Sequence, residues 1–543
     1  MMKKTKNKLS LILVGVVLIL AVLLALFLPS LSKRMEIDRQ FEIAQQYLND
    51  LDYESAMLAF NKILEIDPNN VAVYRGMAEA YIGMGDRNAA FAILEEGIAL
   101  TGSEELAAYL EQLRAEDEEA APAEIVFQNE ELDTAIRTFL GIDGQAPITG
   151  ALLETVNRFS ITPTTLEIEK DFERQPVLES PDMISLLASD PGFIEFVNAC
   201  PDGYGYVFID LYGYEGTAPD LSPFAKLLRL SELNLYDIQF PNLEFLRLFP
   251  DITYLNLVLD GYDLEPLRDL KMEWGQLTVT ANEQKTLDAF LAIAKDYTNL
   301  SSLWIYSRYA DDISGISALS DHKDLWQLSL HMDVLADVSP VASLPQLTYF
   351  GLFSIECESI APLSTLVNLE YLDLRGYSSF DDKPYNGVPD GKLSDISAIA
   401  YMPKLRSINI QECAVTDVSV INGLQELRGL DLPECMISDI SMLTDLPNVK
   451  TIRLDRNKSI RDISVVANYP NLEGLDITEN LITDISAVSN LTNLRYFYFS
   501  ENPISDLTPL SGFSPDVQMD AHDCPIKDWS PVAHIDYVYG RPE

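Results

Sequence analysis

The chain has 543 residues, 47% of them apolar and 9% aromatic, so it can bury more than one core and is not a disordered protein. Its formal net charge of -46 argues against nucleic acid as a partner, because Lys and Arg must neutralise the phosphates. We interpret the acidity mainly as a source of solubility; an acidic surface for a cationic partner is the alternative.

The N-terminus begins with a basic tail at residues 1–8, followed at residues 9–28 by an apolar run interrupted only by Ser10 and Gly15. At about 1.5 Å per residue the run matches the roughly 30 Å hydrocarbon layer, which predicts a transmembrane signal-anchor helix. The preceding lysines predict a single-pass membrane protein with its N-terminus in the cytoplasm and its bulk outside. A cleaved signal peptide, and hence a secreted protein, is the alternative.

Residues 35–114 contain a repeat with a period of 34 residues. Its matching positions are Ala44, Tyr47, Ala56 and Phe60 in the first copy and Ala78, Tyr81, Ala90 and Leu94 in the second. The pattern resembles two tetratricopeptide repeats, which are helical hairpins, and residues 106–113 predict their capping helix. Such a region either binds a peptide or serves as a spacer. The acidic segment 115–124 predicts a linker.

Residues 125–161, with Phe127, Leu132 and Ile136, resemble the helical N-terminal cap of internalin-like leucine-rich proteins, and Val156 and Phe159 near their end have the spacing of a strand. Residues 162–205 read as an insertion before the next regular repeat. Within it, Ser180-Pro181 and Asp190-Pro191 each predict a helix start, with a polar cap followed by proline in the first turn. Two short helices are therefore expected between Pro181 and Asn198.

Residues 206–537 repeat an LxxLxL strand followed by a polar turn, usually 22 residues apart. The predicted strand starts are Tyr206, Leu230, Ile252, Trp274, Leu300, Leu325, Leu347, Leu369, Leu405, Leu427, Val449, Leu472, Leu494 and Asp516. A period of 20 to 29 residues with this strand is typical of leucine-rich repeats. Each unit must stack on its neighbours to bury its leucines, which leaves the intervening positions facing outward.

Residues 125–535 resemble the internalin-like leucine-rich proteins of Gram-positive bacteria, on the basis of the repeat, the cap and the D-I-S turns. The resemblance implies an α/β solenoid: a curved leucine-rich array with a helical N-terminal cap. Ahead of it we expect the all-α tetratricopeptide hairpin region and one transmembrane helix. Irregularities at residues 283–297, a predicted helix, and 375–392, a predicted loop, fall within the array.

Two recurring polar positions follow the strands. The first is a predicted buried ladder, occupied by Asn282, Cys413, Cys435, Asn457, Asn480, Asn502 and Cys524. The second is a column of aspartates at Asp395, Asp417, Asp439, Asp462, Asp484 and Asp506. We interpret the aspartates as turn residues beside a hydroxyl N-cap, and predict no metal site. The cysteines are expected to be buried thiols, although a bridge between Cys413 and Cys435 is sterically open.

Catalytic patterns are absent from the sequence: there is no G-x-S-x-G, Walker A, H-E-x-x-H or C-x-x-C. His522 and Cys524 are close in sequence, but a nucleophile also needs a third group that orients its base. We therefore predict a non-enzymatic protein without a catalytic residue or a cofactor.

Aromatic residues are concentrated at outward positions in the middle of the array. The predicted partner-binding residues are Tyr254, Trp304, Tyr306, Trp326, Tyr349, Phe353 and Tyr371 on the concave face, with Tyr377, Phe380 and Tyr385 in the adjoining loop. Exposed aromatics on a rigid sheet are typical of binding hot spots, although such rings can also simply pack on one another. The predicted ligand is a protein or peptide met at the outer face of a bacterial membrane. A cell-wall glycan stacked on the same aromatics, or a host-cell surface bound by an adhesin, are the alternatives.

Overall fold

The structure is a computed structural model. It describes residues 33–34, 36–37, 39–48, 52–84, 86–119, 125–143, 146–201, 205–214, 218–236, 238–272, 275–297, 299–377 and 388–542. The chain forms two compact units. Unit 1 contains the described residues up to Phe159 together with Glu167–Leu178 and Asp190–Tyr206; unit 2 contains Ser160–Leu166, Glu179–Ser189 and the chain from Val207 onward.

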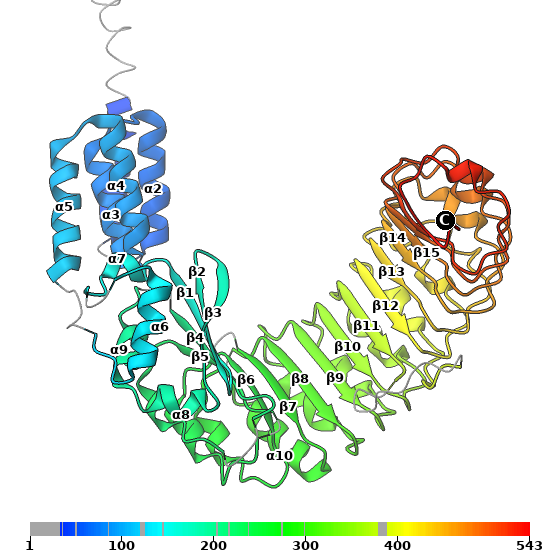
Figure 1. The fold of residues 1–543 in the computed structure, drawn as a ribbon, viewed down its shortest axis with the longest axis horizontal. Coiled ribbons are helices and arrows are strands. Elements are labelled where there is room, and N and C mark those ends of the chain that lie inside the picture. The colour runs from blue at the N-terminus through cyan, green and yellow to red at the C-terminus, as the bar shows by residue number, and fades with distance from the viewer. Residues whose placement is uncertain are drawn as a thin grey trace, which may run out of the picture. The chain divides into compact units, whose positions relative to one another are not determined.

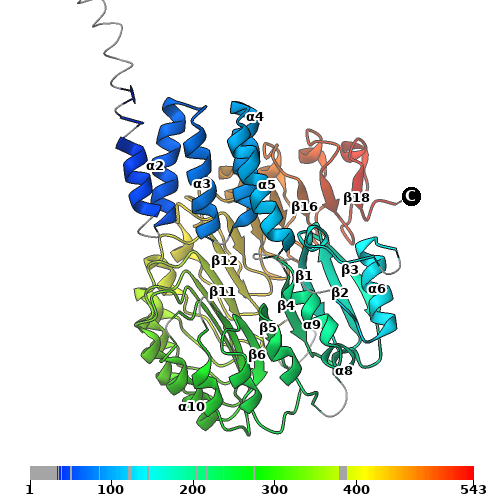
Figure 2. The same cartoon turned by 90° about the vertical axis from the view of Figure 1, so that its left-hand side faces the viewer.

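The first part of unit 1 is a set of antiparallel helices that lie side by side (Figure 2). After a helical stretch at residues 39–48 come α2 (Tyr53–Ile66), α3 (Val71–Gly83), α4 (Arg87–Thr101) and α5 (Glu104–Glu119). Six of the eight predicted repeat positions are buried: Ala44, Ala56, Phe60, Ala78, Ala90 and Leu94. Tyr47 is exposed and Tyr81 is half-buried. A Cβ on Gly76 would lie 2.3 Å from the ring of Phe60, so a small residue there lets α2 and α3 approach closely.

Helix α5 is longer than the sequence predicts. It continues through Glu119 and so occupies the first half of the predicted linker, whose residues 120–124 lie outside the described part. Leu106, Leu110 and Leu113 on α5 are buried against α3 and α4, as expected of a capping helix. Beyond Leu113 the helix continues through Arg114, Ala115 and three glutamates, residue types that favour helix.

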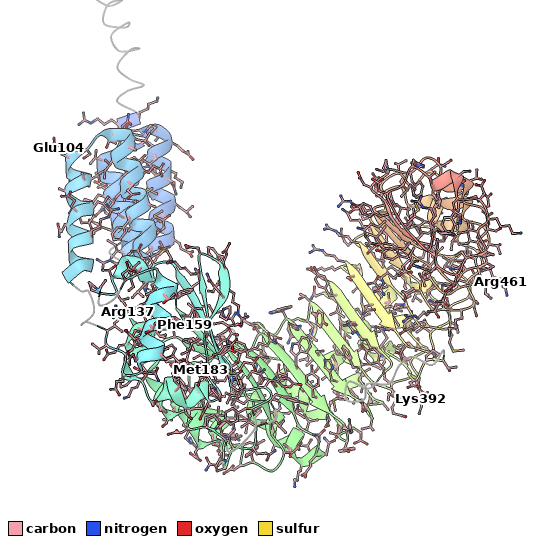
Figure 3. All side chains as sticks on the ribbon, viewed as in Figure 1. Glu104, Arg137, Phe159, Met183, Lys392 and Arg461 are labelled. Atoms are coloured by element: carbon pink, nitrogen blue, oxygen red, sulfur yellow. The ribbon has the colours of Figure 1, made fainter. Side chains whose placement is uncertain are left out.

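The second part of unit 1 is built around a cluster of phenylalanines. It comprises α6 (Glu130–Leu140), α7 (Gly150–Leu153), the beginning of β1 (Val156–Ile161) and α9 (Pro191–Asn198). The ring of Phe159, labelled in Figure 3, meets Phe193 and Phe196 edge-on, with centroids 6.0 and 5.6 Å apart. The core of this part therefore packs a strand residue, Phe159, against two rings of α9.

The segment predicted as an insertion belongs partly to this core. Asp190 is buried; its Oδ2 accepts hydrogen bonds from the backbone N–H groups of Gln128 and Asn129, both at 2.8 Å. Its Oδ1 caps α9 through Gly192, which confirms the predicted Asp190-Pro191 helix start. The other predicted start is wrong, because Asp182 rather than Ser180 caps α8 (Met183–Ala188).

The same segment also contains a hairpin that the sequence did not predict. Its strands are β2 (Thr165–Lys170) and β3 (Glu173–Glu179), joined by Asp171 and Phe172, which both have positive φ. Turns of this kind usually contain Gly or Asn, so the hairpin leaves no recognisable turn signal in the sequence.

Unit 2 is a parallel sheet in which each strand pairs with the next along the chain. The pairings run from β4 through β18 in sequence order. The strands line the inner side of the curve of this unit (Figure 1). They are β4 (Tyr206–Asp210), β5 (Leu230–Asn234), β6 (Tyr254–Val258), β7 (Gln276–Thr280), β8 (Ser302–Ser307), β9 (Gln327–Met332), β10 (Tyr349–Phe353), β11 (Tyr371–Arg375), β12 (Ser407–Gln411), β13 (Gly429–Asp431), β14 (Thr451–Arg453), β15 (Gly474–Asp476), β16 (Tyr496–Tyr498), β17 (Gln518–Asp520) and β18 (Tyr537–Tyr539). The long parallel sheet fits the predicted solenoid.

The return arms contain one-turn 3-10 helices and α10 (Gln284–Ala294), which confirms the helix predicted near residues 283–297. The 3-10 helices are η1 (Ser222–Lys226), η2 (Glu244–Leu248), η3 (Glu265–Asp269), η4 (Ser314–Leu319), η5 (Ser339–Ser343), η6 (Ala361–Thr365), η7 (Ser397–Tyr401), η8 (Ser419–Ile421), η9 (Ser464–Asn468), η10 (Ser486–Val488), η11 (Thr508–Leu510) and η12 (Ser530–Val532). Figure 1 shows α10 on the outer side of unit 2.

The aspartate column performs the turn chemistry of these arms. In each repeat the aspartate Oδ1 accepts the backbone N–H two residues later, as in Asp417 with Ser419 and Asp484 with Ser486, both at 2.8 Å. This corrects one detail of the prediction, because the carboxylate, and not the hydroxyl of the following Ser or Thr, is the capping acceptor. The reason is geometric: the Ser or Thr is already the first residue of the 3-10 turn.

The Asn and Cys ladder is confirmed as buried at Cys435, Asn457, Asn480 and Asn502. Cys524 makes the same bond to the preceding coil but is half-buried, Cys413 bonds within its own coil, and Asn282 is half-buried and does not take part. The Nδ2 group of Asn480 donates to the backbone oxygens of Leu454 and Ile477, and Asn457 and Asn502 make equivalent bonds. The thiol of Cys435 donates to Ile410 O in the same manner. All five cysteines are free, so the bridge left open between Cys413 and Cys435 does not form.

The localisation prediction is corrected by the structure. Among the described residues, no helix combines the length and the apolar composition needed to cross a bilayer. Residues 9–28, on which the predicted single-pass anchor rested, lie outside the described residues. The fold therefore gives a membrane anchor no support.

Candidate interaction face

The outward side chains of the strands of unit 2 form columns, because the parallel register sets equivalent positions side by side. One column joins Gln327, Tyr349 and Tyr371 on β9, β10 and β11. Another joins Tyr306, His331, Phe353 and Arg375. The predicted residues Tyr254, Trp304, Tyr306, Tyr349, Phe353 and Tyr371 all lie in such outward positions. We call the outward side of β4 to β12 the strand face.

The second column is a continuous stack of flat groups. The centroids of Tyr306 and His331 are 4.2 Å apart and those of His331 and Phe353 are 3.9 Å apart, with ring planes within 22° of parallel. The guanidinium carbon of Arg375 lies 4.8 Å from the Phe353 centroid, and Trp304 stacks beside His331 at 5.6 Å. We call these five side chains the aromatic stack. His331 and Phe353 are each covered on two sides by other members of the stack.

His331 is the centre of this stack, although the sequence analysis treated the histidines as scattered. Its Nε2 lies 3.0 Å from the hydroxyl of Ser329, and its side chain is buried. Burial, and then the nearby Arg375 charge, lower the pKa of His331 to about 3. The ring is therefore neutral at neutral pH, which suits it to stacking between apolar rings.

Arg375 ends the stack and is neutralised by its own strand. Its Nε and Nη2 atoms donate to the two oxygens of Asp373 at 2.9 and 3.1 Å, and its Nη1 donates to the Tyr377 hydroxyl at 2.7 Å. The Nδ2 group of Asn409 donates to Asp373 as well. A planar guanidinium can stack on a ring and bind a carboxylate with two bonds at the same time.

The predicted aromatics differ in how firmly they are held. The Trp304 Nε1 donates to Ser302 Oγ at 3.2 Å, which fixes the indole ring. Tyr349 is half-buried, and this burial, followed by the Asp373 carboxylate, raises its pKa to about 12. Tyr371 is 44% exposed and Trp326 is 46% exposed, so these two offer the most ring surface to a partner.

Trp326 departs from the prediction in one respect: it lies one residue before β9 and outside the columns. In the LxxLxL pattern the second and third residues both point outward, and only the third belongs to the strand. Trp326 is the second residue of its repeat, and Gln327 is the third. Tyr377 does border the stack, with its ring edge-on to Phe353 at 6.0 Å. Phe380 and Tyr385 lie outside the described residues.

A hollow of about 260 Å³ opens on the strand face beside the N-terminal end of the stack. It is lined by Tyr212, Tyr236 and Tyr306 and by the polar side chains of Asn234, Asn256 and Thr280. The first two tyrosines stack on each other at 6.1 Å. We call this feature the tyrosine hollow. Apart from Tyr306, the sequence analysis missed these residues. Their signal in the sequence is that Asn and Tyr recur at outward positions of successive coils, and aligning the coils by their repeat would reveal it.

The pair His522 and Cys524 shows no sign of nucleophilic chemistry. The imidazole Nδ1 of His522 lies 2.6 Å from Asp520, but the Cys524 thiol donates to the backbone oxygen of Phe499 at 3.3 Å. Burial raises the pKa of that thiol. A reactive cysteine needs a lowered pKa, so the environment of Cys524 is that of a structural thiol.

The comparisons with known proteins agree with the two kinds of repeat. The family model described as "Leucine Rich repeats (2 copies)" matches residues 470–512, and that described as "Tetratricopeptide repeat" matches residues 48–113. Both predictions are thereby confirmed for the matched residues. Repeats of these kinds are interaction modules, and neither family is a catalytic one. A search of curated proteins finds no match.

Several solved structures are similar to this chain. An internalin from Listeria monocytogenes is 21% identical, with 77% of this chain and 97% of that chain covered at a TM-score of 0.42. A second one, internalin C2, is 28% identical over 36% of this chain and 81% of its own, at 0.32. A leucine-rich repeat protein from Leptospira interrogans is 14% identical over 62% and 92%, at 0.38.

Proposed function

We propose that this protein is a non-enzymatic interaction module that binds a protein or peptide on the strand face of unit 2. The observation that carries the proposal is the aromatic stack, a row of interlocked side chains on a preformed parallel sheet. Because those groups are already held in place, a partner would bind without first ordering them, and less conformational entropy is lost.

The composition of the face supports this proposal. Its centre is uncharged, since His331 is neutral and Arg375 is paired with Asp373. Trp326 and Tyr371 are exposed at the N-terminal ends of β9 and β11 on the same face. Large aromatic side chains around a desolvated centre are typical of the hot spots of protein interfaces.

The net charge of -46 disfavours nucleic acid as the partner on this face. A glycan could stack on the same rings, but a sugar also needs polar groups beside each ring. The stack offers few, because its polar atoms at Ser329, Asp373 and Arg375 already bond to one another or to their neighbours.

The test uses a random peptide library displayed on phage and panned against the full chain. We expect an enriched sequence motif whose binding is weakened at least about tenfold by Tyr371→Ala and Trp326→Ala, the loss of a typical hot-spot ring. The control is Tyr401→Ala, because Tyr401 is even more exposed, at 60%, but lies in η7 on the return arm. Binding lost in the control but kept in the strand-face variants would contradict the proposal.

A further inference from the structure

We propose that the tyrosine hollow is a subsite for a basic side chain, best an arginine, of the peptide bound on the strand face. This inference rests on the proposed function, and it adds the chemistry of one recognition position. The argument starts from a row of polar side chains that leads into the hollow.

That row begins at a carboxylate. Asp210 Oδ1 accepts a hydrogen bond from Asn234 Nδ2 at 2.9 Å, and Asn234 Oδ1 accepts one from Asn256 Nδ2 at 2.9 Å. An ionised carboxylate can only accept, so it turns the amino group of Asn234 toward itself and the carbonyl of Asn234 away from itself. The carbonyl oxygen of Asn234 in turn binds the amino group of Asn256, so the carbonyl oxygen of Asn256 is the last group of the row.

The terminal oxygen is left unsatisfied. Asn256 Oδ1 is buried and has no hydrogen-bond partner among the described residues, and the same is true of Thr280 Oγ1. Thr280 is only 4% exposed, and both residues line the hollow. A buried polar atom without a partner costs about 1–3 kcal/mol, so these two atoms favour a ligand that brings hydrogen-bond donors.

The surroundings favour a donor that is also cationic. Burial is the main cause that raises the pKa of Tyr254, and the Asp210 and Glu232 carboxylates add to it, so two negative charges lie near the hollow. The rings of Tyr212, Tyr236 and Tyr306 add electron-rich faces, which attract cations. At about 260 Å³ the hollow is smaller than the roughly 300–1,000 Å³ of sites for whole small molecules, so it suits one side chain.

The molecule already contains this arrangement elsewhere on the same face. Arg375 lies over Phe353 while its donors bind Asp373, which combines an aromatic surface with an acceptor-rich neighbour. The hollow offers the same two components: its tyrosine rings provide the aromatic surface, and the Asn256 carbonyl oxygen provides the acceptor. Arginine fits better than lysine, because its planar guanidinium can stack on a ring and donate in several directions at once.

The test measures the binding of small probes to the full chain by ligand-observed NMR. The probes are Nα-acetyl-arginine methylamide, the citrulline analogue, which has nearly the same shape but no charge, and methyl glucoside. We expect the arginine probe to bind at least about tenfold more tightly than the citrulline probe, since charge-assisted hydrogen bonds are roughly twice as strong as neutral ones. Equal binding of the two, or preference for the glucoside, would overturn the proposal.

Variants assign the binding to the hollow. Thr280→Val keeps the shape and removes the hydroxyl, and Asn256→Leu removes the terminal carbonyl; each should weaken binding of the arginine probe several-fold. The matched control is Asn409→Leu, because Asn409 occupies the same register column as Asn256 but lies outside the hollow. Equal effects of control and hollow variants would refute the subsite.

Peptide panning can distinguish failure of the arginine subsite from failure of the proposed peptide-binding function. Peptides panned on the wild-type chain should show an arginine at one fixed position, and panning on Thr280→Val should lose that preference while keeping the aromatic-dependent motif. A motif without any arginine preference would overturn the subsite alone. Probe binding without any strand-face motif would uphold the hollow and sink the proposed function.

Discussion

The imidazole ring of His331 lies flat against the phenyl ring of Phe353, with centroids 3.9 Å apart and planes 22° apart. The two residues are directly opposite each other on adjacent parallel strands. Tyr306 covers the other face of the imidazole, and Arg375 lies over the phenyl ring. Removing a side chain held on both sides should affect folding, whereas removing an exposed neighbour should affect binding alone.

Trp304 and Trp326 should therefore differ in how much each side chain contributes to the free energy of unfolding. Trp304→Ala should lower the free energy of unfolding by about 2 kcal/mol, because it removes a half-buried ring that stacks on His331. Trp326→Ala should change it by less than about 0.5 kcal/mol, since the side chain is largely exposed. Urea unfolding followed by circular dichroism provides the comparison, and equal losses would show that Trp326 is structural.

His331 should make stability depend on pH in the acid range. Its pKa is about 3 in the folded chain and near 6.5 when unfolded, so between these values the unfolded chain binds more protons. Stability is therefore fully present above about pH 6.5 and falls on acidification by up to about 1.4 kcal/mol per pH unit.

The variant His331→Phe keeps a stacked ring and removes the titration. Urea midpoints measured between pH 7 and pH 5 should fall less steeply for this variant than for the wild type. Parallel curves would mean that His331 titrates normally. The comparison uses slopes, since the lost bond to Ser329 shifts the variant equally at both pH values.

Arg375 should contribute more to stability than an exposed arginine in a later coil. Arg375→Ala leaves the partly buried Asp373 carboxylate with fewer donors and uncovers Phe353, so we expect a loss of about 2 kcal/mol. The control is Arg495→Ala, because the Arg495 side chain is 78% exposed and its Nε lies 3.8 Å from Glu473. An exposed pair of this kind contributes less than about 1 kcal/mol. Losses of equal size would contradict the structural role of the stack.

The aspartate column offers a test of turn chemistry against ion binding. Asp484→Asn keeps an oxygen that can accept from the Ser486 N–H, so its melting temperature should stay near that of the wild type. Asp484→Ala removes the acceptor and should lower it. Added calcium should leave all three unchanged; a calcium-dependent rise that both variants abolish would establish an ion site instead. The hydrogen bond lowers the Asp484 pKa, so this contribution fades only as pH falls below the usual aspartate range.

The regular part of the fold was predictable because its cause is local. A leucine that recurs at the same points of each repeat must be buried at the same points of each coil, so Leu328, Leu330 and their equivalents locate the strands. Strand prediction failed where a repeat lacks one of these apolar residues. The last strand, β18, was missed because its final core position is occupied by Gly540, which has a positive φ.

Other features were missed because their signal is not periodic. The hairpin turn at Asp171 and Phe172 has Phe172 where such turns usually have glycine, and phenylalanine rarely adopts positive φ. The segment around Asp190 appeared to be an insertion, because a buried carboxylate that holds two backbone N–H groups of residues 128 and 129 cannot be recognised from spacing. Such long-range polar contacts depend on the folded backbone.

The sequence by itself determined the repeat architecture and the outward location of most aromatics in the middle of the array, since both follow from a period and from alternation along a strand. Only the tertiary structure decided what those aromatics do. The register of adjacent strands sets Tyr306, His331 and Phe353 in one stack, leaves Trp326 outside it, and ends the row from Asp210 at an unsatisfied oxygen of Asn256. These relations join residues of different coils, and they exist only once the sheet has formed.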